Sequence, residues 1–258
     1  MLAVWIVFAP FAAAFAVYGI GKKSETARDF TAIGFTFAEL CLSAALLFSM
    51  PSFTIRGIFI GGLAFTTDGF RAVYSIVTSV MWAGTTLFSE EYFKEEREGL
   101  NGYLFFVLIT LGATQGVMLS ADLMTAFIFF EILSFTSFTW VIHEENEAAI
   151  RAAKTYLAIA VIGGLLLFMG LLLLWHAAGT LEFSELKASA AGASDQKEVF
   201  AAGVLILFGF GAKAGMFPLH IWLPKAHPVA PAPASALLSG ILTKVGVYGI
   251  LMTTVQAF

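Results

Sequence analysis

A lysine at the end of an apolar helix is followed at once by a stretch that prolines interrupt and that carries two histidines. The segment FGFGAKAGMFPLHIWLPKAHPVAPAPAS, residues 208–235, contains Lys213, His220, His227 and five of the seven prolines of the chain. A charge in hydrocarbon costs roughly 3 kcal/mol or more. Interrupted helical backbone is tolerated at membrane depth only inside protein or beside a wet cavity. Both costs at one place indicate an ion path.

The composition indicates an integral membrane protein. Of the 258 residues, 59% are hydrophobic and 12% are charged, and about 20 apolar residues span a bilayer as a helix. We therefore predict an all-α fold in the lipid bilayer, with no soluble domain and with no nucleic acid as a partner. Eight spans are predicted, at about 2–21, 30–50, 69–89, 101–120, 122–142, 150–175, 199–223 (interrupted) and 233–256.

Several local features complete this prediction. The N-terminus MLAVWIVFAPF lacks the basic region and the cleavage site of a signal peptide, so we expect it to remain as a span. The Gly-punctuated segment 51–68 predicts a short external hairpin. The lone Cys41 excludes an intramolecular disulfide, and we expect it to be a small buried hydrophobe. Trp5, Trp140, Trp175 and Trp222 lie near span ends, where an aromatic belt would place them.

Lysine and arginine are unevenly distributed between the two sets of loops. With the N-terminus outside, seven basic residues fall in cytoplasmic loops and four in external loops. Because cytoplasmic loops are enriched in basic residues, both termini are expected to face the exterior. The seven are Lys22, Lys23, Arg28, Lys94, Arg97, Arg151 and Lys225; the four are Arg56, Arg71, Lys187 and Lys197.

Charged residues also lie within the predicted spans. Glu131 is near the middle of the fifth span, Lys154 lies early in the sixth, Lys213 ends the first half of the seventh, and Lys244 lies in the eighth. Such residues mark ion pathways more often than chance allows. Glu39, in the second span, is explained equally well by function and by packing against a polar group or cavity water.

Glu131 and Lys213 are the expected pair. A buried carboxylate and a buried ammonium stabilise each other's charged form within about 4–6 Å. Gly215 and Pro218 follow Lys213 and predict a broken helix, whose last carbonyl groups would point the negative end of the helix dipole at the ammonium. A lysine whose proton affinity depends on a movable acidic neighbour suits a pump. The alternative is a static ion pair that fixes helix register.

The two histidines favour a proton relay over a metal site. His220 and His227 are seven residues apart with no third His or Cys nearby, whereas a zinc site needs three or four ligands. Imidazole titrates near neutral pH, which suits proton transfer along a chain of water molecules. No metal site is therefore predicted.

Three segments resemble the antiporter-like membrane subunits of respiratory complex I, membrane-bound hydrogenases and Mrp-type sodium/proton antiporters. The stretch FPLHIWLPKAH, within residues 213–248, resembles the broken seventh helix of that family. Residues 103–133 are similar to its fourth and fifth helices, and AAKTYLAIAVIGG, residues 152–164, is similar to its sixth. The resemblance covers essentially the whole chain.

The resemblance implies a fold and a set of ion-path residues. Residues 1–100 would form an N-terminal three-helix membrane segment, and residues 101–258 an antiporter-like repeat of helices four to eight. Glu131 would be the fifth-helix glutamate, and Lys213 the lysine of the broken seventh helix. The resemblance implies no catalytic residue, metal or cofactor in this chain. The implied translocation residues are Glu131, Lys154, Lys213, His220, His227 and Lys244.

Family members usually carry a second inverted repeat, and the present sequence stops after its eighth span. Because inverted-repeat transporters need both halves, we expect this chain to supply one half-channel and to transport no ion alone. A partner membrane subunit is expected to continue the polar axis near Lys244.

Three functions stay open. The favoured one is a proton or sodium/proton translocating subunit of a redox-driven complex of the complex I or membrane-bound hydrogenase type, in a prokaryotic inner membrane. The second is a subunit of a Mrp-type antiporter. The third is a structural or assembly subunit without transport.

Overall fold

The chain folds into a bundle of membrane-spanning helices. The computed structural model describes residues 2–50, 52–55, 62–95 and 97–257, and within them eight helical segments are long and apolar enough to cross a membrane. The first five are α1 (Leu2–Gly21), α2 (Glu25–Ser49), α3 (Gly69–Tyr92), α4 (Leu100–Met118) and α5 (Leu123–Val141). The all-helical membrane fold is therefore confirmed.

Of the last three spans, the sixth is a continuous helix, and the seventh and eighth contain irregular backbone. The sixth is α6 (Glu147–Ala178), which a surface helix, α7 (Phe183–Gly192), follows. The seventh consists of α8 (Gln196–Ala214), a 3₁₀ turn at Leu219–Trp222 and α9 (Leu223–Ala226). The eighth consists of α10 (Ala232–Leu237), a π-helical turn at Leu238–Leu242 and α11 (Thr243–Ala257).

Polar side chains fix where several helices begin. Ser24, Asp68, Asp122, Asn146 and Asp195 precede α2, α3, α5, α6 and α8, and each accepts a hydrogen bond from a backbone N–H of the first turn. These bonds satisfy donors that have no partner inside the helix. The spans therefore start a few residues earlier than hydrophobicity alone predicts in α2, α6 and α8.

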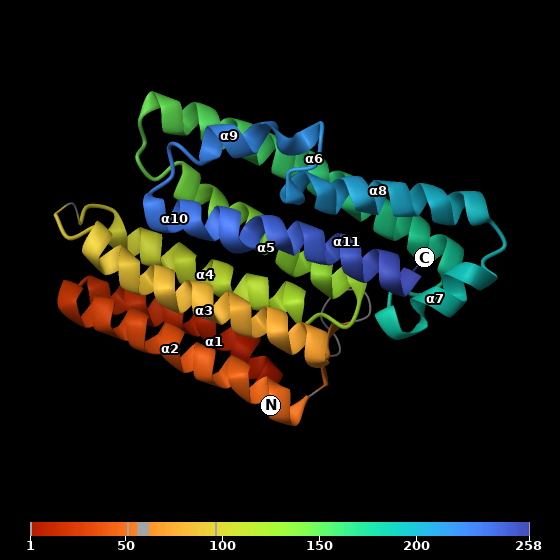
Figure 1. Ribbon diagram of the computed structural model, residues 1–258, viewed down its shortest axis with the longest axis horizontal. Helices are drawn as coiled ribbons and strands as arrows, with labels where there is room; N and C mark the ends of the chain where they lie inside the picture. Colours follow the sequence, from red (N-terminus) through yellow and green to blue (C-terminus); the bar gives the residue numbers. More distant parts are fainter. Residues whose placement is uncertain (1, 51, 56–61, 96, 258) are drawn as a thin grey trace.

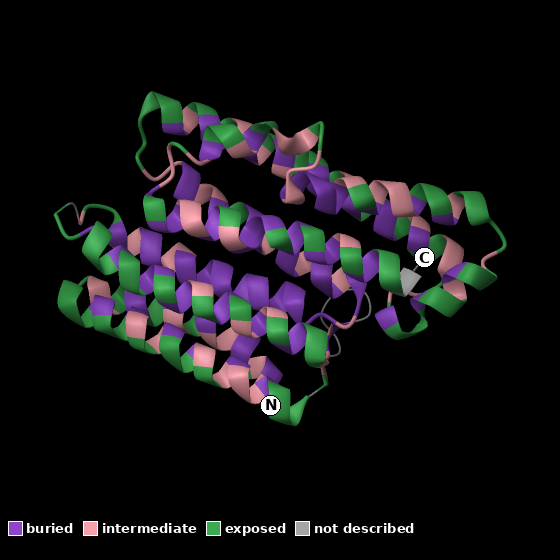
Figure 2. Cartoon of the chain, in the orientation of Figure 1, coloured by how far each residue is buried: buried purple, intermediate pink, exposed green. Residues whose placement is uncertain are grey.

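The core of the bundle surrounds α4, which α1, α3 and α5 cover (Figure 1). Much of α2 and the outward sides of the other outer helices are exposed (Figure 2). They carry large apolar side chains such as Phe30, Phe48 and Leu165, as a surface in contact with lipid requires.

Cys41 is on this exposed face, so the expectation of a buried cysteine is wrong. Trp140 and Trp222 are fully buried in the bundle, so they are not belt residues in contact with lipid headgroups.

The two ends of the bundle differ. The turns between α1 and α2, α3 and α4, and α5 and α6 lie at one end, and α7 and both termini lie at the other (Figure 1). The second end also carries a hairpin of β1 (Phe53–Ile55) and β2 (Leu63–Phe65), with Phe53 opposite Phe65. A hairpin is therefore present within segment 51–68, as predicted, and its tip lies outside the described residues; its external position stays a prediction.

The seventh span is broken where the sequence predicts. Helix α8 ends at Ala214, and Gly215 takes a left-handed conformation with φ of 78° while its N–H donates to the carbonyl of Gly211. A glycine adopts this conformation without steric cost. No helix continues through residues 215–218, so the two halves of the span are separate helices.

Gly246 allows α11 to approach α8. A Cβ atom at this position would lie 2.4 Å from the backbone nitrogen of Ala214 and 2.5 Å from the carbonyl oxygen of Phe210. We expect Gly246→Leu to lower the free energy of unfolding by about 1–3 kcal/mol or more, because backbone atoms cannot rotate away. Thermal unfolding of the detergent-solubilised complex would measure it. Gly84→Leu, where no atom lies within 4 Å of the added Cβ, is the control; equal melting of both variants would contradict the prediction.

Candidate ion-translocation site

A buried lysine is the centre of the site. Lys213 lies in the last turn of α8 and is 4% exposed. Its Nζ donates to the hydroxyl oxygen of Tyr156 at 2.5 Å, of Ser134 at 3.3 Å and of Ser137 at 3.4 Å. The ammonium is therefore bound by neutral oxygens from α5 and α6, and no carboxylate of the described residues is in direct contact with it.

The bonds among these neighbours hold the cluster together. Ser137 and Tyr156 share a hydrogen bond of 2.6 Å. The ring of Tyr156 packs edge-on against Trp222, with 4.9 Å between ring centres. Trp222 lies in the 3₁₀ turn beyond the break, and its Nε1 donates to the carbonyl of Ala212 at 2.8 Å. The two halves of the seventh span are thus joined at the lysine site.

Glu131 lies on α5, three residues before Ser134 and therefore on the same helix face. Its carboxyl group packs against Gly164 of α6, where an added Cβ would lie 2.4 Å from Oε1. Within the described chain, Oε1 has no hydrogen-bond donor. Glu131 and Lys213 interact electrostatically without forming a direct salt bridge. A cavity of about 10 Å³ beside Lys213 and Ser134 is about the size that one water molecule requires.

Lys154 and Lys244 are exposed on the outside of the chain, so the structure does not bring them into the buried cluster. Lys244 follows the π-helical turn, in which the N–H of Thr243 reaches back to the carbonyl of Leu238. The carbonyl of Ser239, within this turn, accepts a hydrogen bond from the hydroxyl of Thr243 at 3.0 Å and another from the Nζ of Lys244 at 2.5 Å. A cation thus lies at the surface in the middle of the last span.

The two histidines lie in the irregular segments after the break. His220 is partly buried and stacks against Phe217, and its Nδ1 has no hydrogen-bond partner among the described residues. The Nδ1 of His227 lies 2.8 Å from the hydroxyl of Ser235, and partial burial lowers the pKa of His227. Neither ring is hydrogen-bonded to Lys213 in the described structure.

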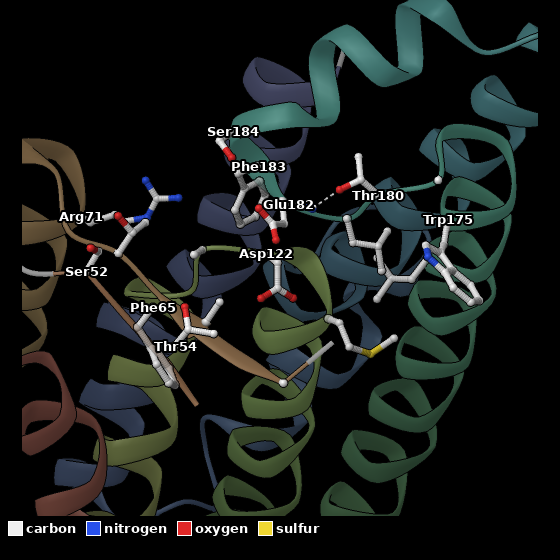
Figure 3. A pocket seen from close by; sticks show the side chains of 18 of the residues that line it. Ser52, Thr54, Phe65, Arg71, Asp122, Trp175, Thr180, Glu182, Phe183 and Ser184 are labelled. Atoms are coloured by element: carbon white, nitrogen blue, oxygen red, sulfur yellow. Dashed lines mark hydrogen bonds between the residues drawn. The ribbon is translucent and has the colours of Figure 1, made fainter. Parts of the chain in front are cut away.

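A cavity of about 630 Å³ lies at the end of the bundle that carries the hairpin and α7 (Figure 3). Arg71, Asp122, Glu182 and Trp175 line it, and Figure 3 shows Asp122 at its centre. Asp122 accepts hydrogen bonds from the backbone N–H and the hydroxyl of Thr125, and burial raises its pKa. By helix rise it is about 13 Å from the level of Glu131. The cavity is therefore apart from Lys213 and lies at the start of α5, the helix that carries Glu131.

Sequence comparison assigns the chain to a family. The model of the NADH:quinone oxidoreductase/Mrp antiporter transmembrane family matches residues 120–258, more than half of the chain. The chain belongs to this family. It is an antiporter-like membrane subunit, as its sequence motifs predict.

Two relatives illustrate the range of the family. The chain is 35% identical to hydrogenase-4 component B of Escherichia coli (strain K12) over 190 residues, which cover 73% of this chain and 28% of that protein. It is 30% identical to a Na(+)/H(+) antiporter subunit of Bacillus subtilis (strain 168) over 189 residues, which cover 73% and 38%. The chain thus spans less than half the length of these relatives.

Solved structures show the same fold in multisubunit membrane complexes. A chain of the membrane-bound sulfane sulfur reductase, an archaeal respiratory membrane complex, matches with a TM-score of 0.84 at 23% identity, covering 96% of this chain and 52% of that chain. A chain of the Mrp complex from Dietzia sp. DQ12-45-1b matches with a TM-score of 0.82 at 21% identity, covering 100% and 49%.

The groups that bind the lysine are not among the residues predicted from the sequence. Ser134 follows Glu131 by three residues and Ser137 follows Ser134 by three, so helical spacing could have placed each serine beside the residue before it in this series. Tyr156 lies two residues after the exposed Lys154, and only the packing of α6 on α8 shows that it faces Lys213. Among the described residues, no group of three His, Cys, Asp or Glu side chains could hold a metal ion.

Proposed function

We propose that the chain is the proton or sodium/proton translocating subunit of a redox-driven membrane complex of the complex I or membrane-bound hydrogenase type. The observation that carries this proposal is Lys213, buried at a helix break and held by neutral hydroxyl groups. Nearby, Oε1 of the Glu131 carboxyl group has no hydrogen-bond donor within the described chain. When this ammonium loses its proton, the resulting neutral amine is not in direct contact with a carboxylate. When the Glu131 carboxylate approaches Lys213, its negative charge favours the protonated form of the lysine.

The steps follow from the geometry of these side chains. A proton bound at Lys213 can pass to the hydroxyl groups of Tyr156 and Ser137, which are already hydrogen-bonded to each other. The irregular segment beyond Gly215 carries His220 and His227, which would take the proton onward through water. Movement of the Glu131 carboxyl group would change the affinity of Lys213 for its proton, as a pump requires.

The chain would supply one half-channel and hold no redox centre of its own. In this proposal residues 1–100 form the N-terminal membrane segment and residues 101–258 the translocating repeat. The exposed Lys244 supports a neighbouring membrane unit that provides a carboxylate or water there, because a cation facing lipid in the middle of a span is costly. The exposed Lys154 makes a similar demand on the surface of α6.

A Mrp-type antiporter subunit is the second candidate. The observation that favours it is the 30% identity to the Na(+)/H(+) antiporter subunit of Bacillus subtilis. This is close to the 35% identity to hydrogenase-4 component B. In that case an ion gradient would drive the same lysine site. A structural subunit is a third candidate, and loss of transport in a Glu131→Gln complex would exclude it.

The composition of the purified complex separates the first two candidates. We expect the affinity-tagged chain, isolated from native membranes, to carry iron–sulfur and hydrogenase-like or quinone-site subunits that mass spectrometry identifies. Membrane subunits alone would contradict the redox-driven assignment and favour the Mrp type.

The distribution of basic residues leads to a topology prediction. Both termini, the hairpin and α7 are proposed to face the exterior of a prokaryotic inner membrane, with Lys94 in the cytoplasm. In a Cys41→Ala background, an impermeant thiol reagent added to intact cells should label Lys187→Cys and not Lys94→Cys. Lys94 and Lys187 are both exposed, so accessibility does not bias the comparison. External labelling at position 94 would reverse the orientation.

A further inference from the structure

A second set of buried polar side chains lies between α2, α3 and α4, on helices other than those that form the Lys213 cluster. Ser43 of α2 and Ser79 of α3 share a hydrogen bond of 2.7 Å. Gln115 of α4 is fully buried, donates to Ser79 at 2.9 Å and accepts from the hydroxyl of Ser75 at 2.7 Å. The three helices are thus joined by a continuous hydrogen-bonded group in addition to their apolar packing.

Glu39 lies one helical turn from Ser43, on the same buried face of α2. Helices α2 and α3 run antiparallel, and Ser43 lies opposite Ser79. Glu39 is therefore at the level of Ala83, between Ser79 and Thr86. It is fully buried, and neither carboxyl oxygen has a hydrogen-bond donor among the described residues. The hydroxyl group of Thr86, on the facing helix, is likewise buried without a partner there.

No cation of the described helices around it is placed to neutralise Glu39. The helices α1 and α4 carry no charged residue. The nearest basic groups on α2 and α3 are Arg28 and Arg71, each about 16–18 Å away by helix rise. An unpaired carboxylate is costly in this environment, and a carboxylic acid that holds a proton is far less so. A purely structural acid would use its oxygens to join helices, and those of Glu39 make no such bond within the described chain.

Both ends of this interface reach cavities. At the end with the α1–α2 turn, Asp29 pairs with Arg28 at 2.8 Å and with Arg97 at 2.7 Å. Cavities of about 50 Å³ and 10 Å³ adjoin Asp29, and the smaller one also touches Thr86. At the other end, Arg71 lies one turn from Ser75 and lines the cavity of about 630 Å³ (Figure 3). Cavities of about 10–15 Å³ or more are large enough for water.

We propose that Glu39 is a second proton-binding site and that the polar α2–α3–α4 interface is a proton path separate from the Lys213 cluster. The proton enters from the cavity at one end, resides on the Glu39 carboxyl group and continues through water and the hydroxyl groups of Ser43, Ser79 and Ser75. The amide of Gln115, which donates to Ser79 and accepts from Ser75, holds these hydroxyl groups in place. Glu39 joins the two halves of this path, because it lies between the Thr86 end and the Gln115 end.

Infrared spectroscopy of the assembled complex in native-lipid membranes tests the proton on Glu39. We expect a carboxylic-acid C=O band at neutral pH that Glu39→Gln removes and that shifts in D₂O within the time of buffer exchange. Thr86→Leu should slow this shift by about tenfold or more, because it closes one end of the path. Absence of the band, or a band that does not exchange, would overturn the proposal.

Proton transport separates this proposal from the function of Lys213. In proteoliposomes, Glu39→Gln should lower the rate of proton transport by about tenfold or more, with Cys41→Ala on the exposed face of α2 as the control. Normal transport in Glu39→Gln and loss in Glu131→Gln would refute the second path and leave the proposed function intact. Normal transport in both variants would refute both.

Discussion

Replacing Lys213 with alanine is expected to abolish coupled ion transport while the complex still assembles. Lys213 is the buried cation of the site, and its three hydroxyl partners remain able to bond to each other or to water after its loss. Its partners in these contacts are neutral hydroxyl groups, so removing the ammonium breaks no direct salt bridge and the fold should survive. We expect transport to fall by about 100-fold or more, as for removal of a proton-transfer group.

Ion flux in proteoliposomes containing the purified complex measures this loss. Lys22→Ala is a matched control, because Lys22 is an exposed lysine in a turn at the end of α1. Size-exclusion chromatography would confirm assembly of both variants. Normal transport by the Lys213→Ala complex would refute the site assignment.

Replacing Glu131 with glutamine is expected to have an effect of similar size. Glutamine keeps the shape of the side chain but removes the charge that acts on Lys213. Because no direct salt bridge joins the two residues, the substitution breaks no ionic contact that holds α5 to α8. Coupled transport should therefore be lost in a complex of normal stability.

A second variant tests the position of this carboxyl group rather than its charge. Gly164→Ala would place a methyl group 2.4 Å from Oε1 of Glu131 and displace it. We expect a partial loss of transport with the charge unchanged. Gly34→Ala, where no atom lies within 4 Å of the added Cβ, is the control. Equal transport by both glycine variants would show that the position of the carboxyl group is unimportant.

The sequence predicts the spans and the helix break well, because both depend on local chemistry. Runs of apolar residues fix the helices, and Gly215 with Pro218 ends α8 wherever the surrounding helices lie. The lysine in its last turn is also a local feature. Its placement deep in the bundle follows from the cost of a charge facing lipid.

The direction in which a side chain points was harder to predict. Lys154 and Lys244 lie in spans but are exposed, whereas Tyr156, two residues from Lys154, is buried. Trp140 and Trp222 lie near span ends yet are fully buried. In a helix that is apolar on all sides, periodicity does not distinguish the lipid-facing side from the protein-facing side.

Glu39 shows the same limit from the opposite direction. Its sequence context is compatible with both a functional and a packing role, and only the facing hydroxyl groups of α3 and the amide of Gln115 show that it lies in a polar interface. In this interface, Gln115 is hydrogen-bonded to Ser75, about 40 positions away in the chain, and to Ser43, about 70 positions away. No local pattern joins them.

The most direct test of the account is the number of ions translocated per turnover by a Lys213→Arg complex. Arginine keeps the positive charge and can donate to the same hydroxyl groups, but it does not release its proton in proteins. If Lys213 works by gaining and losing a proton, the complex should assemble and show no coupled ion translocation. A normal number of ions per turnover in this variant would show that Lys213 is a static charge and would contradict the account.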